Sequence, residues 1–299
     1  MKVLICDPTD PEALKTIEEA GIEVVNQPDI TPEELMDVIP EYECMVVRSR
    51  TKVREPLIDK AENLKAIVRA GVGLDNIDVE YAESKGIQVL NTPSASTRAV
   101  AELTIGYLFA LARRIPQMAI SMREGKWEKK KFLGFELYGK TLGIIGTGRI
   151  GQAVAEKADC LGMDVIGYDP YVDEAPHIKF VPLDELLEKS DFITLHVPHN
   201  EETHHLIDAE ALEKMKDGVR LINCGRGGII DEDALYTAIT EGKVGGAALD
   251  VFAQEPPEGS PLFELEEVIG SPHVGAGTGE AKARVGEVAA QKVISALKE

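Results

Sequence analysis

The chain has few aromatic residues, few cysteines and far fewer basic than acidic residues. Aromatic residues make up 5% of its 299 residues, and 32 lysines and arginines stand against 52 aspartates and glutamates, a formal net charge of -20 at pH 7. An acidic surface repels phosphate backbones and anionic lipids, so we expect no nucleic-acid partner and no membrane partner. With 44% hydrophobic and 28% charged residues, the composition is that of a globular protein long enough for two domains.

The cysteines are widely spaced, at Cys6, Cys44, Cys160 and Cys224, and no pair has the C-x-x-C spacing of a metal or redox site. We therefore expect no metal, and we expect all four side chains to be small buried groups in a reducing cytosol. No apolar run approaches the roughly 18 residues of a membrane span. The N-terminal MKVLICD is too short before its first acidic residue for a secretory signal, so the predicted location is cytoplasmic.

The clearest motif is GTGRIG, which follows a short apolar run at residues 142–145 and precedes helical spacing at residues 152–160. Strand, glycine-rich turn and helix stand in the order of a dinucleotide fingerprint. Gly146 would make the tight turn, Gly148 would let the backbone approach a pyrophosphate, and Gly151 would let the helix pack close to the strand. The helix N-terminus would then hold the anion.

An acidic residue in the right place strengthens this interpretation. A second strand, Asp164 to Tyr168, ends at Asp169, 18 residues after Gly151. A carboxylate there accepts hydrogen bonds from a ribose diol and repels a 2'-phosphate. The motif therefore predicts NAD rather than NADP as the cofactor.

Short β-branched runs alternate with helical stretches along most of the chain, which is the pattern of parallel sheets covered by helices on both faces. Before the fingerprint, strands are expected at residues 3–6, 23–25, 44–47, 66–68 and 88–90. From the fingerprint onward, about six parallel strands are expected, at residues 142–145, 164–168, 192–196, 219–223, 246–251 and 268–269.

The predicted fold class is α/β with two doubly wound parallel-sheet domains, a Rossmann NAD-binding domain inserted into a flavodoxin-like substrate domain. A final helix at residues 279–298 has no strand after it, and its return to the first domain would make that domain discontinuous. We predict a substrate-binding domain of residues 1–93 plus 279–299, and a NAD-binding and dimerisation domain of residues 94–278. Two largely apolar helices, at residues 95–113 and about 116–124, fit a dimer surface and burial within one subunit equally well.

Hydride transfer to NAD requires a group that takes a proton from a hydroxyl and a cation that holds the substrate. Three candidates follow predicted strands, at the edge where open α/β sheets bind ligands: Arg226, Glu255 and His273. Glu255 beside His273 would stabilise the imidazolium and fix its tautomer while His273 serves as general base. Arg226 would hold a substrate carboxylate in a bidentate pair. Taken singly, each could equally be a structural residue.

Taken in order, the motifs resemble those of the D-isomer-specific 2-hydroxyacid dehydrogenases. They are GTGRIG, YDP at 168–170, HVP at 196–198, NCGRGGIID at 223–231, ALDVF at 248–252 with EP at 255–256, and SPH at 271–273. The resemblance implies a two-domain enzyme in which Arg226, Glu255 and His273 are the catalytic residues. It also implies that NAD is bound by Val72, Gly146, Gly148, Arg149, Ile150, Gly151, Asp169, His196, Val197, Pro198, Cys224, Gly225, Arg226, Asp250, His273 and Gly275.

Within that family the chain resembles the branch that acts on a phosphorylated hydroxy acid, through VVRSRTKV at 46–53, VRAGVGLDN at 68–76, NTP at 91–93 and GKWEKKKF at 125–132. Such a substrate carries about three negative charges and needs concentrated cations, which this acidic chain gathers in those segments. Arg50 and Lys52 belong to the same basic group, and the backbone amides of residues 70–73 could form an anion nest for the substrate carboxylate. The predicted substrate-binding residues are Arg48, Ser49, Arg69, Gly71, Val72, Gly73, Asn91, Lys129 and Lys131.

Several alternatives stay open. The lysine run at residues 129–131 could be a solvated loop. The enzyme could be a reductase of unphosphorylated acids such as glyoxylate or hydroxypyruvate, or the protein could be a NAD-sensing, corepressor-like scaffold. Many members of the phosphorylated-substrate branch continue into a regulatory domain, so this chain either lacks that regulation or is truncated. We expect a homodimer, with a tetramer as the alternative.

Overall fold

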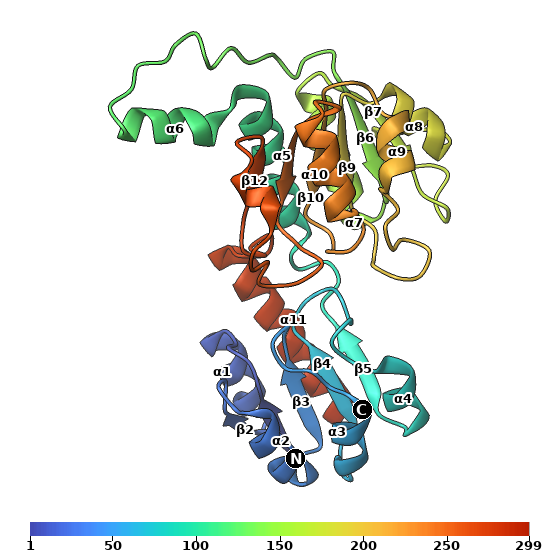
Figure 1. Ribbon diagram of the computed structural model, residues 1–299. Helices are drawn as coiled ribbons and strands as arrows, with labels where there is room; N and C mark the ends of the chain where they lie inside the picture. The colour runs from blue at the N-terminus through green and yellow to red at the C-terminus, as the bar shows by residue number, and fades with distance from the viewer. Residues whose placement is uncertain (299) are drawn as a thin grey trace. The chain divides into compact units, whose positions relative to one another are not determined.

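The computed structural model describes residues 1–298, and the chain divides into two compact units. One consists of Met1–Thr97 with Ala276–Glu299, and the other of Arg98–Gly275 (Figure 1). The first unit is therefore built from both ends of the chain. The two units are described in turn.

The terminal unit contains five parallel strands in the order β2-β1-β3-β4-β5. The strands are β1 (Lys2–Ile5), β2 (Glu23–Asn26), β3 (Cys44–Val47), β4 (Ala66–Arg69) and β5 (Gln88–Asn91). The helices are α1 (Pro11–Glu19), α2 (Pro32–Val38), the 3₁₀ helix η1 (Ile39–Glu41), α3 (Glu55–Lys60), α4 (Val79–Ser84) and α11 (Gly279–Lys298). Helices α1 and α11 bury one face of the sheet, and α2 to α4 bury the other. This is the flavodoxin-like strand order.

Local sequence signals set the helix ends of this unit. Helix α2 begins with a capping box, in which the Thr31 hydroxyl accepts from the Glu34 amide and the Glu34 carboxylate accepts from the Thr31 amide. Helix α11 packs against α1 at Gly286, where a Cβ would lie 2.8 Å from the Cβ of Asp10. The missing side chain lets the last helix return closely onto the first.

The central unit contains seven parallel strands in the order β12-β11-β10-β9-β6-β7-β8. The strands are β6 (Thr141–Ile145), β7 (Asp164–Tyr168), β8 (Lys179–Phe180), β9 (Phe192–Leu195), β10 (Val219–Asn223), β11 (Val244–Leu249) and β12 (Val268–Gly270). The helices are α5 (Thr97–Arg113), α6 (Ile115–Arg123), α7 (Arg149–Cys160), α8 (Leu183–Lys189), α9 (Ala209–Lys214), α10 (Glu232–Thr240) and the 3₁₀ helix η2 (Pro261–Glu264). The strand order reverses between β6 and β9, where open α/β sheets bind ligands.

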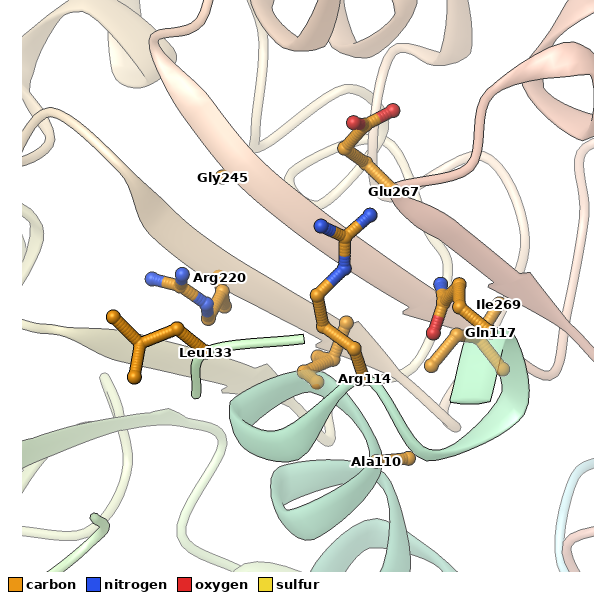
Figure 2. A pocket seen from close by; sticks show the side chains of 9 residues that line it. Ala110, Arg114, Gln117, Leu133, Arg220, Gly245, Glu267 and Ile269 are labelled. Carbon is orange, nitrogen blue, oxygen red and sulfur yellow. The ribbon is translucent and has the colours of Figure 1, made fainter. Parts of the chain in front are cut away.

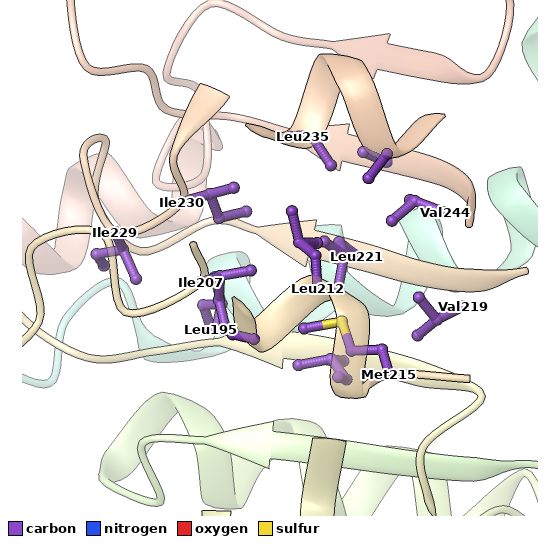
Figure 3. Packing of buried hydrophobic residues seen from close by; sticks show 14 of the residues in the cluster. Leu195, Ile207, Leu212, Met215, Val219, Leu221, Ile229, Ile230, Leu235 and Val244 are labelled. Atoms are coloured by element: carbon purple, nitrogen blue, oxygen red, sulfur yellow. The ribbon is translucent and has the colours of Figure 1, made fainter. Parts of the chain in front are cut away.

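Two hydrophobic clusters hold this sheet in place. Helices α8, α9 and α10 cover one face, with Leu212, Leu221 and Leu235 among the buried contacts (Figure 3). Helices α5 and α7 cover the other face, where Leu108 and Val154 are fully buried. Burial on both faces explains why the central strands are continuous apolar runs. It also leaves the strand ends as the places where polar side chains can gather.

The structure confirms the predicted fold class, two parallel α/β sheets with helices on both faces. The expected strand count of the central sheet was wrong, because β8 adds a seventh strand. This strand has two residues, too few for sequence periodicity to reveal, and helix α8 after it was also not predicted. The expectation of four buried cysteines was also wrong, since Cys160 is exposed at the end of α7. In the described part of the chain, no helix combines the length and apolar character needed to cross a membrane.

Candidate active site

The glycine-rich turn after β6 has the geometry that its sequence predicts. The Gly146 amide donates to the Tyr168 carbonyl at 2.9 Å, and Gly146 has φ +91°, a region that favours glycine. A Cβ there would lie 2.7 Å from the backbone of His196. A Cβ on Gly151 would overlap the Gly146 carbonyl oxygen, so the third glycine lets α7 start directly against the turn.

The start of α7 offers backbone donors. The first hydrogen bond of the helix runs from the Gln152 amide to the Gly148 carbonyl at 2.9 Å, so the preceding amides, including those of Arg149 and Ile150, have no partner within the helix. Nothing lies within 4 Å of a Cβ placed on Gly148. Open space above free amides at a helix N-terminus suits a pyrophosphate. The turn therefore fits the cofactor that the fingerprint predicts.

Asp169 lies beside this turn at the end of β7. Its Oδ2 accepts from the Thr147 amide at 2.8 Å, and its Oδ1 accepts from the Tyr171 amide at 2.9 Å. Oδ2 also accepts from the Thr147 hydroxyl at 3.4 Å, so Oδ1 is the oxygen that keeps a further lone pair for a ribose hydroxyl. Thr147 and Tyr171 were not among the predicted site residues. A signal for Tyr171 was present, because an aspartate commonly accepts from the amide two residues on.

His196 follows β9, next to the glycine-rich turn. Its Nε2 lies 3.0 Å from the Thr194 hydroxyl, and its buried Nδ1 has no hydrogen-bond partner among the described residues. Burial lowers the pKa of His196 from 6.5 to about 4, so the ring is neutral at physiological pH. A neutral imidazole can lie beside a bound cofactor. His196 therefore does not contribute a positive charge to the site.

The loop after β10 presents Arg226. The Asn223 side chain fixes the loop, because its Nδ2 donates to the Arg226 carbonyl at 2.8 Å and its Oδ1 accepts from the Gly225 amide at 3.0 Å. Arg226 is partly buried, and its Nη1 donates to the Gly225 carbonyl at 2.8 Å. A Cβ on Gly227 would overlap the Phe252 carbonyl, so this glycine permits the close approach of the β11 loop. Burial raises the pKa of the adjacent Cys224 thiol to about 12, and that thiol stays protonated.

Glu255 and His273 are in direct contact. His273 Nδ1 lies 2.8 Å from Glu255 Oε2, and Glu255 Oε1 accepts from the Phe252 amide at 3.2 Å. The carboxylate is thus fixed by its own loop and in turn fixes the imidazole ring. Because Nδ1 faces the carboxylate, Nε2 is the ring nitrogen left for a substrate.

The three predicted catalytic residues follow adjacent strands, Arg226 after β10, Glu255 after β11 and His273 after β12. All three therefore stand at the carboxyl edge of the sheet, the same edge as the glycine-rich turn and Asp169. His273 and Glu255 touch, and Arg226 is placed beside them by strand order. A histidine with a carboxylate partner can accept a proton, and a guanidinium at the same edge can bind the carboxylate of an acid substrate.

The remaining predicted cofactor residues stand at the same edge, with one exception. Val197, Pro198 and Gly275 lie in the loops after β9 and β12. Asp250, which follows β11, is 1% exposed, and its carboxylate accepts from the amides of Val274 and Gly275. Val72 belongs to the terminal unit.

The predicted substrate residues of the terminal unit also follow strands. Arg48 and Ser49 come after β3, Arg69 ends β4 with Gly71 and Gly73 following it, and Asn91 ends β5. Asn91 Nδ2 donates to the Val72 carbonyl at 2.6 Å and so fixes the 70–73 turn. In the described part of the chain, neither the Val72 amide nor the Gly73 amide donates a hydrogen bond, so both can serve an anion.

Arg50 does not fit the expected anion cluster. Its guanidinium pairs with the buried Asp7 at 2.9 Å and donates to the carbonyls of Cys6, Pro28 and Ile30. These contacts give Arg50 a structural role within its own unit. In the central unit, Lys129 and Lys131 lie on an exposed loop, and Lys131 pairs with Glu266 at 3.4 Å.

A polar cavity of about 210 Å³ lies elsewhere on the central unit (Figure 2). Arg114, Gln117, Arg220 and Glu267 line it. Arg220 stands near the start of β10 and Glu267 directly precedes β12, so the cavity is at the amino ends of these strands. It is therefore separate from the carboxyl-edge site.

Comparison with known proteins agrees with this geometry. Residues 105–275 match the family model described as the D-isomer specific 2-hydroxyacid dehydrogenase, NAD binding domain. The chain is 50% identical over 303 residues to D-3-phosphoglycerate dehydrogenase of Methanocaldococcus jannaschii, covering all of this chain and 58% of that protein. It is 49% identical over 300 residues to hydroxypyruvate reductase of Thermotoga maritima, covering 99% of this chain and 98% of that protein.

Solved structures show the same architecture. The crystal structure of the TT0316 protein from Thermus thermophilus superposes with a TM-score of 0.93 at 36% identity. The alignment covers 100% of this chain and 97% of that one. The whole described fold, including both units, is thus found in a solved relative.

Two glycine substitutions separate the structural from the ligand-binding role of the turn. We expect Gly151→Ala to destabilise the central unit by about 1–3 kcal/mol, because its Cβ overlaps the Gly146 carbonyl. Gly148→Ala has open space and is expected to keep wild-type stability while weakening NAD binding roughly tenfold or more. Urea unfolding and calorimetric NAD titration measure the two effects. Wild-type NAD affinity in Gly148→Ala would contradict the assignment of this turn.

The partly buried His196 predicts a loss of stability in acid. Its pKa of about 4 in the folded protein lies below the 6.5 of the unfolded chain, so only the unfolded chain binds the proton as pH falls from 6.5 to 4. The free energy of unfolding should fall by roughly 2–3 kcal/mol from this group over that range. Urea unfolding at pH 7.5 and 4.5 measures how much the free energy of unfolding falls in acid. In His196→Gln this fall should be smaller than in the wild type by roughly 2–3 kcal/mol. An equal loss in both proteins would contradict the prediction.

Proposed function

The chain belongs to the D-isomer-specific 2-hydroxyacid dehydrogenase family, and from that premise we propose that it oxidises 3-phospho-D-glycerate to 3-phosphohydroxypyruvate with NAD. This is the first step of L-serine biosynthesis. The contact between His273 and Glu255 carries the proposal, because it supplies an oriented base beside the expected nicotinamide site. The match to phosphoglycerate dehydrogenases supports the substrate. That relative is longer than this chain, so the activity of the whole protein is itself part of the proposal.

The mechanism uses the three strand-end residues in separate roles. His273 Nε2 takes the proton from the C2 hydroxyl, and Glu255 stabilises the imidazolium that forms. Arg226 holds the substrate carboxylate beside the developing carbonyl. Bound NAD would supply the acceptor for the hydride that leaves C2 with its electron pair. The proton and hydride together account for the two electrons and two hydrogens lost by the alcohol.

The turn after β6 would hold the pyrophosphate and Asp169 the adenosine ribose. The two oxygens of Asp169 are fixed by the Thr147 and Tyr171 amides, so the carboxylate cannot turn away from a 2'-phosphate. A fixed negative charge favours NAD over NADP at this position. His196, Val197 and Pro198 would line the cofactor from β9.

The phosphate would be held by cations of the terminal unit, with Arg48 the strongest candidate. The Arg48 amide is anchored to the buried Asp7 carboxylate at 2.5 Å, while among residues 1–298 its side chain makes only a 3.3 Å contact with the Pro8 carbonyl. The backbone is thus fixed and the guanidinium is weakly held. The amides of Val72 and Gly73 would receive the substrate carboxylate. Lys129 and Lys131 would add positive charge.

We also propose that the protein is a homodimer and is located in the cytoplasm. Helix α6 and the chain after it stand out from the sheet of their unit (Figure 1). They expose Ile120, Met122, Trp127 and Leu133, and Trp127 is 80% exposed. An exposed apolar segment of this kind is typical of a subunit interface. Sedimentation equilibrium tests this point, and a monomer at micromolar concentration would contradict it.

The proposal of a cytoplasmic location rests on the cysteines. The free cysteines, one of them exposed, suit a reducing compartment.

A substrate panel distinguishes the proposed activity from that of a reductase. We expect NADH formation at alkaline pH with 3-phosphoglycerate and little with D-glycerate, D-lactate or glycolate. Arg48→Ala should raise the KM for 3-phosphoglycerate about tenfold or more, because a charge-assisted phosphate contact is lost. Any residual turnover of D-glycerate, which has no phosphate, is the internal control and should not change.

The similarity to a hydroxypyruvate reductase supports the alternative. Preferential turnover of D-glycerate or glycolate, unaffected by Arg48→Ala, would reject 3-phosphoglycerate as the substrate and favour a glyoxylate or hydroxypyruvate reductase. NAD binding without turnover of any acid would instead favour a NAD-sensing scaffold.

A further inference from the structure

The backbone of His273 is in an unfavourable conformation. Its φ is +50°, in the left-handed region that residues other than glycine rarely adopt. Such a conformation persists only where surrounding contacts hold it. The contacts that hold this turn therefore decide where the imidazole stands.

Asp250 supplies most of those contacts. Its Oδ1 accepts from the Val274 amide at 2.8 Å, and its Oδ2 accepts from the Gly275 amide at 2.7 Å. Its Oδ1 also accepts from the hydroxyl of Ser271, on the other side of His273. A carboxylate that is 1% exposed thus grips the chain both before and after His273. The orientation of Asp250 and Ser271 fixes the turn.

Tyr107 in turn fixes Ser271. Its hydroxyl donates to the Ser271 Oγ, which leaves the Ser271 proton directed at Asp250. Tyr107 is 7% exposed, and burial raises its pKa to about 12, so it stays a donor throughout the working range of the enzyme. The buried Tyr107 and Asp250, linked through the partly buried Ser271, therefore form one directed chain from helix α5 to the turn.

The same face of α5 supports neighbouring parts of the site. Val100, Thr104 and Tyr107 have the i, i+4, i+7 spacing of one helix face. Val100 packs 3.3 Å from a Cβ position on Gly275. Thr104 contacts the Cys224 thiol. This contact partly offsets the rise in the pKa of the thiol that burial causes. Helix α5 thus contacts both the turn that carries His273 and the loop that carries Arg226.

We propose that Tyr107 is a positioning residue for His273, acting through Ser271 and Asp250. This inference rests on the proposed role of His273 as the base. Without the Tyr107 hydroxyl, Ser271 Oγ rotates, Asp250 loses a fixed donor, and the backbone at His273 relaxes toward a common conformation. The Nδ1 contact with Glu255 is then lost and Nε2 no longer meets the substrate hydroxyl. The variant is therefore expected to lose turnover while it keeps its affinity for the cofactor.

The test combines Tyr107→Phe with changes at Ser271. We expect Tyr107→Phe to lower kcat by about threefold to tenfold, with the KM for NAD nearly unchanged. The pH at which kcat is half-maximal should move, because the base has lost its fixed partner. Ser271→Ala should lower kcat at least as much, and Ser271→Thr, which keeps the hydroxyl, should restore most of it. The double variant should equal Ser271→Ala alone, since Tyr107 acts through Ser271.

Tyr42→Phe is the matched control. Tyr42 is a 5% exposed tyrosine of the terminal unit, and loss of its hydroxyl should leave kcat and the pH profile unchanged. A lower melting temperature of Tyr107→Phe with wild-type kcat and pH profile would overturn the proposal, as would fully additive losses in the double variant. If Tyr107→Phe does not fold, equal turnover by Ser271→Ala and wild type would overturn it. Absence of turnover by the wild-type protein on every acid would instead reject the proposed function.

Discussion

Two carboxylates hold the turn that carries His273, and the chemistry proposed for the site depends on them. Asp250 binds the backbone on both sides of His273, and Glu255 binds the ring. Both acids follow β11, while the histidine follows β12, so the pairing of these parallel strands brings the histidine and the two acids together. The left-handed backbone of His273 shows that local preference alone would not place the ring there.

Much of the site could be predicted because its signals are local. The glycines of GTGRIG, the position of Asp169 and the strand-end placement of Arg226 each follow from short stretches of sequence. The fold class was predictable for the same reason, since alternating strands and helices permit few arrangements. The two-residue strand β8 carries no periodic signal, and its place beside β7 is set by tertiary packing.

Contacts between distant segments could not be predicted from sequence. Tyr107 lies in a helix whose apolar pattern suggested only burial or a subunit interface, and its partner Ser271 is 164 positions away. Arg50 shows the opposite difficulty. In the sequence it looks like one of several phosphate-binding cations, whereas in the structure it pairs with the buried Asp7. Charge patterns identify which cations a segment has, and only packing decides which of them a ligand can reach.

The most direct test of the account is the turnover of His273→Ala beside that of His177→Ala. His177 is a suitable comparison because it also has a positive φ and a carboxylate partner, with Nδ1 2.7 Å from Asp159, yet it lies outside the site. Loss of the general base predicts a kcat about a hundredfold to ten-thousandfold lower in His273→Ala, with NAD affinity retained and His177→Ala close to wild type. Unchanged kcat in His273→Ala would contradict the central claim.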